Sequence, residues 1–189
     1  MKNIVNYTEA ANKFLHKEIV LFKLTSHIIF FYRICNKLYY NNIHQKNILI
    51  KRLTTIFIRI LSVYYNLLLN VFYGGYIPYV AKIGKNIRFP HGLSGIFISN
   101  KAEIGDDCVI LHHVTVGSYI NKNKGGEFSP KIGEGVFIGC NSCIIGKTII
   151  GNNCQIGAGT TIVNAEIPDN CTVVGSKFRI INQIEALSE

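Results

Sequence analysis

The sequence is poor in charged residues and lacks tryptophan. Charged residues make up only 16% of its 189 positions, against 48% apolar residues, and there are four prolines and one methionine. Because a disordered chain combines low hydrophobicity with high charge, this composition excludes a disordered protein. It predicts one folded domain, or a small domain with an appendage, with enough apolar residues for a packed core.

Acidic residues are scarce, and the resulting positive charge is unevenly distributed. Residues 1–75 contain ten basic and two acidic residues, a net charge of +8, whereas residues 76–189 contain ten basic and nine acidic residues, a net charge of +1. The charge therefore divides the chain into two parts. No recognisable nucleic-acid-binding module accompanies the basic part, so nucleic acid is not an expected partner.

A secretory signal and a disulfide or zinc framework are also missing. Residues 1–17 contain no apolar core and no small-residue cleavage site, which predicts a cytoplasmic protein. In a reducing compartment the six cysteines are expected to be small buried residues rather than disulfide partners. Cys140 and Cys143 form a CxxC pair with no second pair elsewhere, so no metal site is predicted.

One uncharged run approaches the length of a membrane span. It extends over the 22 residues Ile60–Ala81, but asparagine, glycine and proline interrupt it. The preceding Ile48–Leu61 mixes basic and apolar residues, as a surface helix does. Two interpretations stay open: the basic helices contact the inner membrane peripherally, or they pack on their own protein with a solvated basic face.

The chain changes character after residues 74–78, where two glycines and a proline end a region expected to hold two or three helices. From Ile83 onward, aliphatic residues recur at every sixth position, a period of neither helix nor strand. This column includes Ile132, Ile138, Ile144, Ile150, Ile156 and Ile162, then Pro168 and Val174. A second column of small or β-branched residues lies four positions later, at Val136, Ser142, Thr148, Cys154, Thr160 and Thr172. Two columns in one register predict a solenoid whose triangular coils each comprise three six-residue units, with the aliphatic column inside.

Two insertions interrupt the repeat. Nine residues instead of six separate Phe89 from Ile98, and sixteen separate Val116 from Ile132, which predicts a protruding loop at residues 118–130. When the inserted residues are subtracted, a spacing of 18 places five residues on one edge of successive coils: His91, His112, Cys140, Ala158 and Ser176. His113, next to His112, is expected to point elsewhere, which argues against a shared zinc ion.

Three segments carry a resemblance to a known family: AKIGKNIRFPHGLSGIFIS, AEIGDDCVILHHVTVGS and SPKIGEGVFIGCNSCIIGKTIIGNNCQIGAGTTIV. Together they resemble the serine acetyltransferase branch of the hexapeptide acyltransferases, over residues 76–182. The resemblance implies a mainly β fold, a left-handed parallel β-helix behind a short α-helical segment at residues 1–75, with a tail at 183–189. It also implies a homotrimer that holds acetyl-CoA in clefts between neighbouring prisms and transfers acetyl to a hydroxyl.

The resemblance also implies site residues. His91 falls where the family has its catalytic histidine, the general base that deprotonates the acceptor hydroxyl, and His112 is a second catalytic candidate on the same edge. Ser118, Cys140 and Ala158 match positions whose main chain contacts coenzyme A. Lys177 and Arg179 are candidates for binding its phosphates, with a solvated end cap as the alternative.

The chain departs from the family at the acceptor side. The carboxylate that orients the family's histidine is replaced by Tyr76, an acidic residue by Pro90, and the Arg-His pair that binds serine by Phe128 and Ser129. Losing those charge-assisted contacts disfavours serine as acceptor. The expected acceptor is a sugar hydroxyl of a surface polysaccharide or its precursor; a serine O-acetyltransferase and a non-catalytic prism that binds a partner or membrane are the alternatives.

Overall fold

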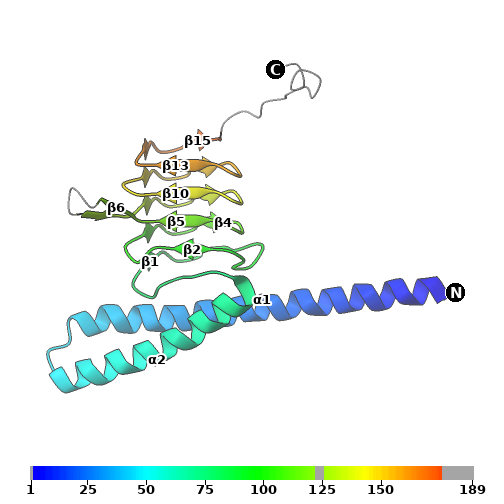
Figure 1. The fold of residues 1–189 in the computed structure, drawn as a ribbon, viewed down its shortest axis with the longest axis horizontal. Helices are drawn as coiled ribbons and strands as arrows, with labels where there is room; N and C mark the ends of the chain where they lie inside the picture. The colour runs from blue at the N-terminus through cyan, green and yellow to red at the C-terminus, as the bar shows by residue number, and fades with distance from the viewer. Residues whose placement is uncertain (1, 122–125, 176–189) are drawn as a thin grey trace, which may run out of the picture.

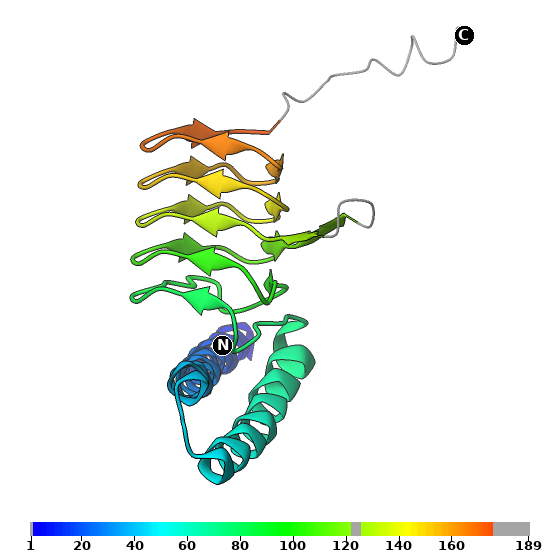
Figure 2. The same ribbon diagram turned by 90° about the vertical axis from the view of Figure 1, so that its left-hand side faces the viewer.

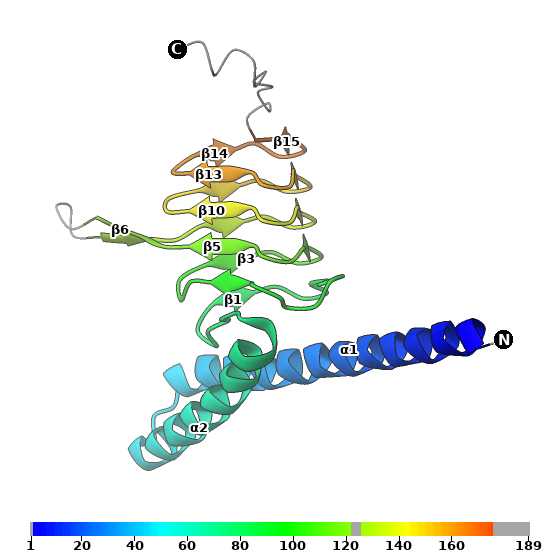
Figure 3. The same cartoon turned by 45° about the vertical axis from the view of Figure 1, so that its right-hand side comes forward.

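The computed structural model describes residues 2–121 and 126–175, and it divides into a helical hairpin and a prism (Figure 1). Helix α1 (Lys2–Ile43) and helix α2 (Ile48–Tyr73) form the hairpin. Figure 3 shows both helices beneath the first coil of the prism, running across the direction in which the coils stack. The predicted helical segment thus contains two helices.

Local capping sets the limits of α2. The Asn47 side chain accepts hydrogen bonds from the backbone nitrogens of Leu49 and Ile50, at 3.0 and 3.2 Å, which satisfies two donors of the first turn. Gly74 adopts a left-handed conformation, with φ of 58°, and its N–H donates to Asn70 O at 2.9 Å. Such a conformation favours glycine, so the expected helix stop is where α2 ends.

The prism has three walls, each a parallel sheet. Wall 1 consists of β1 (Lys82–Ile83), β3 (Glu103–Ile104), β8 (Lys131–Ile132), β11 (Ile149–Ile150) and β14 (Glu166–Ile167). Wall 2 consists of β2 (Phe97–Ile98), β5 (Thr115–Gly117), β10 (Cys143–Ile145) and β13 (Thr161–Val163). Wall 3 consists of β4 (Val109–Ile110), β9 (Phe137–Ile138), β12 (Gln155–Ile156) and β15 (Thr172–Val173). The chain visits the walls in the order 1, 3, 2 and forms a left-handed β-helix, as expected.

The two sequence columns form the core of the prism. Isoleucines of the first column, from Ile83 to Ile162, are all buried, with at most 9% of their surface exposed. The second column is also buried, from Ala102 to Thr160. Each short strand therefore contributes one inward aliphatic side chain per coil, and the core continues into α1 and α2 through residues such as Ile77 and Tyr65.

The predicted register is wrong in the last coil. Ile150 pairs with Ile167 and Ile156 with Val173, so these coils comprise 17 residues, and the inward positions are not Pro168 and Val174. Val174 is 72% exposed. The cause is a shorter corner: Asn164, at φ of 52°, turns the chain after β13 with one residue fewer than the corresponding corner after β10.

The larger insertion forms a hairpin that projects from the prism (Figure 2). Its antiparallel strands are β6 (Tyr119–Asn121) and β7 (Gly126–Phe128), in which Tyr119 pairs with Phe128. The loop predicted at residues 118–130 is therefore a two-stranded arm whose base lies at the corner between walls 2 and 1.

Candidate active site

The corner between walls 3 and 2, here called the imidazole corner, carries the two candidate catalytic histidines. At this corner a left-handed residue recurs in each coil, at Gly95, His113, Asn141 and Gly159. Hydrogen bonds link the coils: His113 N donates to Ser94 O at 2.7 Å, Asn141 N to His112 O at 3.2 Å, and Gly159 N to Cys140 O at 2.8 Å. These bonds fix which residues stack.

The stack differs from the predicted one at its first position. Ser94, rather than His91, precedes the left-handed residue as His112, Cys140 and Ala158 do. Arg88 still pairs with Val109, so the three additional residues lie between Phe89 and Ser94, and His91 belongs to the inserted turn itself. At the other end, Ser176 lies outside the described residues.

The inserted turn nevertheless brings His91 to His112. Their rings meet edge to face, with centroids 5.2 Å apart and planes at 87°. The His91 side chain is exposed, whereas the His112 side chain is partly buried. The Nδ1 atom of His112 is fully buried and has no hydrogen-bond partner within the described residues. An accessible imidazole held against a second ring can accept a proton from a hydroxyl placed beside it.

His113 lies on the outside of the same corner. Its ring packs directly over Gly95, where a β-carbon would have no room, and it contacts the His112 ring at a centroid distance of 5.4 Å. The sequence predicted that His113 would diverge from His112, yet the two rings remain in contact. Among the side chains that the structure describes, those of residues 23–119 and 128–175, no group of three histidine, cysteine, aspartate or glutamate residues is arranged to hold a metal ion.

Three serines form a second polar cluster at the base of the arm. Ser118 Oγ lies 2.8 Å from Ser129 Oγ, and Ser99 Oγ donates to Ser129 Oγ at 3.3 Å. The predicted acceptor residue Phe128 lies beside them on β7 and is partly exposed. This hydroxyl cluster is at the corner between walls 2 and 1, so the three-residue strand β5, roughly 10 Å long, separates it from the imidazole corner.

Tyr76 lies at the base of wall 2. It forms a parallel bridge with Phe97, and both side chains are exposed. Among the described residues, no hydrogen bond joins Tyr76 to His91. Within one chain, the structure therefore assembles His91 with His112 and Ser118 with Ser129, but it does not assemble these two pairs with each other.

The cofactor candidates divide in the same way. Cys140 and Ala158 follow His112 on successive coils of the imidazole corner, and Ala158 is exposed. Ser118 belongs to the other corner. Lys177 and Arg179 lie outside the described residues. Burial raises the pKa of the Cys35 thiol to about 11 and also raises the pKa of Cys108, so these two thiols are protonated at neutral pH.

Comparison with known proteins identifies the family. Residues 129–164 match the family described as bacterial transferase hexapeptide (six repeats). WcaB of Escherichia coli strain K12, whose name assigns it to colanic acid biosynthesis as an acetyltransferase, is 34% identical over 120 residues, which are 64% of this chain and 71% of WcaB. This chain belongs to the hexapeptide-repeat acetyltransferases.

Solved serine acetyltransferases share the fold of this acetyltransferase. The Neisseria gonorrhoeae enzyme in complex with serine has a TM-score of 0.62 and 31% identity, covering 79% of this chain and 54% of that one. The Brucella abortus enzyme in complex with coenzyme A has a TM-score of 0.60 and 28% identity, covering 82% of this chain and 54% of that one. This acetyltransferase thus spans about half the length of these relatives.

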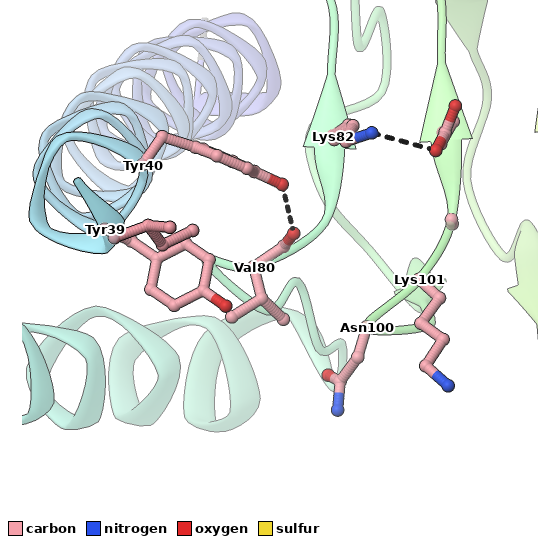
Figure 4. A pocket seen from close by; sticks show the side chains of 9 residues that line it. Tyr39, Tyr40, Val80, Lys82, Asn100 and Lys101 are labelled. Atoms are coloured by element: carbon pink, nitrogen blue, oxygen red, sulfur yellow. Dashed lines mark hydrogen bonds and ion pairs between the residues drawn. The ribbon is translucent and has the colours of Figure 1, made fainter.

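The acetyltransferase also has a hollow of about 470 Å³ where the end of α1 meets the first coil (Figure 4). Tyr40 Oη donates to Val80 O at 3.0 Å, and Lys82 Nζ forms an ion pair with Glu103 Oε1 at 3.0 Å. Asn100, which lines the hollow, directly follows Ser99 of the hydroxyl cluster. The hollow combines aromatic faces with amide and charged groups and lies on the corner of the arm, not on the imidazole corner. Its aromatic and polar lining residues are Tyr39, Tyr40, Lys82, Asn100, Lys101 and Glu103.

Proposed function

We propose that this protein transfers the acetyl group of acetyl-CoA to a sugar hydroxyl of a surface polysaccharide, such as a capsule or O-antigen, or of its precursor. The observation that carries the proposal is the exposed His91 ring, held edge to face against His112. The positions that the family resemblance matches to the acceptor site carry no charge. Tyr76 and Phe128 offer aromatic faces, Tyr76 and Ser129 offer hydroxyls, and Pro90 is uncharged. Such groups suit a neutral sugar ring better than an amino acid, whose ammonium and carboxylate each need a partner.

The proposed reaction is a direct transfer. His91 removes the proton from the acceptor hydroxyl as its oxygen attacks the thioester carbonyl, and the tetrahedral intermediate expels coenzyme A, whose thiolate takes the proton back from the imidazolium. The oxygen–carbon bond of the ester forms as the carbon–sulfur bond breaks, so atoms and charge balance. No acyl-enzyme is required, and the buried thiols Cys35 and Cys108 are protonated and unsuited to forming one.

We further propose a homotrimer in the cytoplasm. The imidazole corner and the hydroxyl cluster occupy different corners of one prism, so the arm must come from a neighbouring subunit if its serines are to approach His91. A cleft between prisms would then hold acetyl-CoA along Cys140 and Ala158. The solved relatives in complex with coenzyme A support this donor.

Serine is the second candidate acceptor, since a structural relative is solved in complex with serine. The two functions separate in an acceptor panel in which release of coenzyme A is followed with a thiol reagent. We expect release to depend on oligosaccharides prepared from the surface glycans of the source cell and to be lost in His91→Ala. The matched control is His44→Ala, an exposed histidine just beyond the end of α1. Serine-dependent release without any glycan-dependent release would contradict the proposal.

A further inference from the structure

Helix α2 has two apolar faces, of which the protein covers one. The covered face packs against α1 and the base of the prism through Ile58, Tyr65, Leu69 and Tyr73. At 3.6 residues per turn, the centre of the second face lies about 180° from the first. We call this second face the outer face of α2. Its side chains are 43% to 68% exposed: Leu49, Leu53, Ile56, Phe57, Ile60, Val63, Tyr64, Leu67 and Val71.

The outer face is a contiguous patch of nine exposed apolar side chains, and such a patch marks a surface that binds a protein or a membrane. A helix that is apolar on all sides is normally buried in a protein or in contact with lipid. The patch also continues onto α1, because the Phe31 ring packs against Tyr64 at 5.3 Å and the exposed Phe30 packs against Phe31 at 5.5 Å. Figure 2 shows α1 and the first coil on one side of α2, which leaves its opposite side uncovered by the chain.

The charges of α2 are all positive, and two of the three lie beside this face. The helix contains no aspartate or glutamate, and its three charged residues are Lys51, Arg52 and Arg59. Arg52 and Arg59 are seven residues apart, two turns of helix, and therefore follow one edge of the outer face. Together with Ile56 they line a shallow groove of about 440 Å³. An apolar stripe edged by basic residues matches a bilayer surface, with acyl chains against the stripe and anionic headgroups against the edge.

We propose that the outer face of α2 lies in the plane of an anionic lipid bilayer and holds the acetyltransferase at the membrane surface. The helix is long and apolar enough to span a membrane by its length and composition. Its covered face, however, is tied to the protein: Tyr65 Oη donates to Ile77 O at 2.8 Å, and Tyr73 Oη lies 2.7 Å from Thr25 Oγ1. Spanning would break these contacts, whereas lying in the interface keeps them.

A second copy of α2 is a poorer occupant. It would present another stripe edged by arginines and no acidic residue to neutralise them, whereas anionic lipid supplies the opposite charge. The proposal does not depend on the identity of the acceptor, because lipid contact and acetyl transfer use different residues.

Because the sequence contains no tryptophan, a single introduced tryptophan can report directly whether the outer face of α2 enters the bilayer. A single tryptophan is introduced by Ile60→Trp on the outer face and, as matched control, by Phe137→Trp on the exposed side of wall 3. Each variant is mixed with vesicles of phosphatidylcholine alone or with phosphatidylglycerol, both carrying brominated acyl chains. We expect quenching of the tryptophan at position 60 only in the anionic vesicles and no quenching at position 137. An unquenched tryptophan at position 60 in both vesicle types would overturn the proposal.

Two further double variants distinguish a lipid surface from a second copy of α2 as the partner of the outer face. Each basic residue near an anionic surface strengthens binding roughly fivefold, so Arg52→Gln with Arg59→Gln is expected to weaken vesicle co-sedimentation about 30-fold. Leu53→Glu with Leu67→Glu is expected to abolish it while the thermal unfolding temperature and the particle mass in lipid-free buffer stay unchanged. A fall in particle mass would instead identify a second copy as the occupant, and resistance of the wild-type protein to alkaline carbonate extraction would identify a span; either result overturns the proposal.

Discussion

The edge-to-face pair of His91 and His112 predicts unequal consequences for its two members. If His91 is the base, His91→Ala removes the group that accepts the proton, and general-base contributions of this kind amount to roughly 10²- to 10⁴-fold in rate. His112 contacts that ring at a centroid distance of 5.2 Å. Such ring pairs contribute about 0.5–1.5 kcal/mol beyond area burial, so removing the contact costs at most about tenfold in rate through misplacement of His91.

The informative variant is His112→Phe, which keeps a ring beside His91 but cannot carry a proton. We expect it to retain a kcat close to that of the wild type, while His112→Ala, which loses the ring as well, falls by up to about tenfold. Steady-state kinetics with acetyl-CoA and a glycan acceptor measure both. Light scattering and circular dichroism check that each variant is folded and assembled. A near-normal kcat in His91→Ala together with a collapse in His112→Phe would refute the assignment and make His112 the base.

Four further predictions concern the assembly, the core and two thiols. Light scattering in non-denaturing buffer should give a mass that is a multiple of three chains, and an active monomer would contradict the shared cleft. Ile138→Ala, at a fully buried column position, should lower the free energy of unfolding by about 2–5 kcal/mol in denaturant melts; a loss below about 1 kcal/mol would contradict a close-packed prism. Burial raises the pKa of the Cys35 thiol from its ordinary value of 9.0 to about 11, so Cys35 should resist alkylation at pH 8. The protonated thiol also contributes stability, which is lost as the pH rises from 9.0 through about 11. Cys140, which is partly exposed, should be alkylated at that pH and be protected by acetyl-CoA, and the absence of protection would exclude Cys140 from the cofactor cleft.

Most of the prism could be predicted because its period is set locally. One inward aliphatic side chain every six residues is the condition for closing a triangular coil, and Ile132 to Ile162 satisfy it without interruption. The shift of one residue in the last coil could not be predicted from the sequence. Ile167 and Pro168 are adjacent apolar residues, as are Val173 and Val174, and either residue of each pair fits the aliphatic column. Only the length of the corner decides between them: residues 164–165 separate β13 from β14, whereas residues 146–148 separate β10 from β11.

The site was predicted less completely than the fold. The period shows that three residues are inserted between Phe89 and Ile98, but it does not show where they sit, and so His91 was placed in the column that Ser94 occupies. The contact between the His91 and His112 rings depends on how the inserted turn folds back, which no spacing encodes. The hydroxyl cluster was likewise not predicted, because Ser99 precedes Ser129 by thirty residues. The stacking of consecutive coils, in which Ser99 N donates to Val116 O at 2.8 Å, brings Ser99 to the base of the arm.

The helical hairpin shows a different limit. Its charge marked it as a separate part, and the glycine at position 74 marked the end of α2. Which face of α2 is covered could not be read from the sequence, because aliphatic and aromatic residues occur all around this helix. The uncovered outer face is therefore a finding of the structure.

The most direct test of the proposed acetyl transfer compares two acceptors for the same purified enzyme. Products formed from acetyl-CoA with L-serine and with an oligosaccharide of the source cell's surface glycan are analysed by mass spectrometry, and kcat/KM is determined for each acceptor. The uncharged acceptor positions Tyr76, Phe128 and Ser129 predict an O-acetylated sugar and a far higher kcat/KM for the oligosaccharide. Efficient, saturable formation of O-acetylserine with an unmodified oligosaccharide would contradict the account.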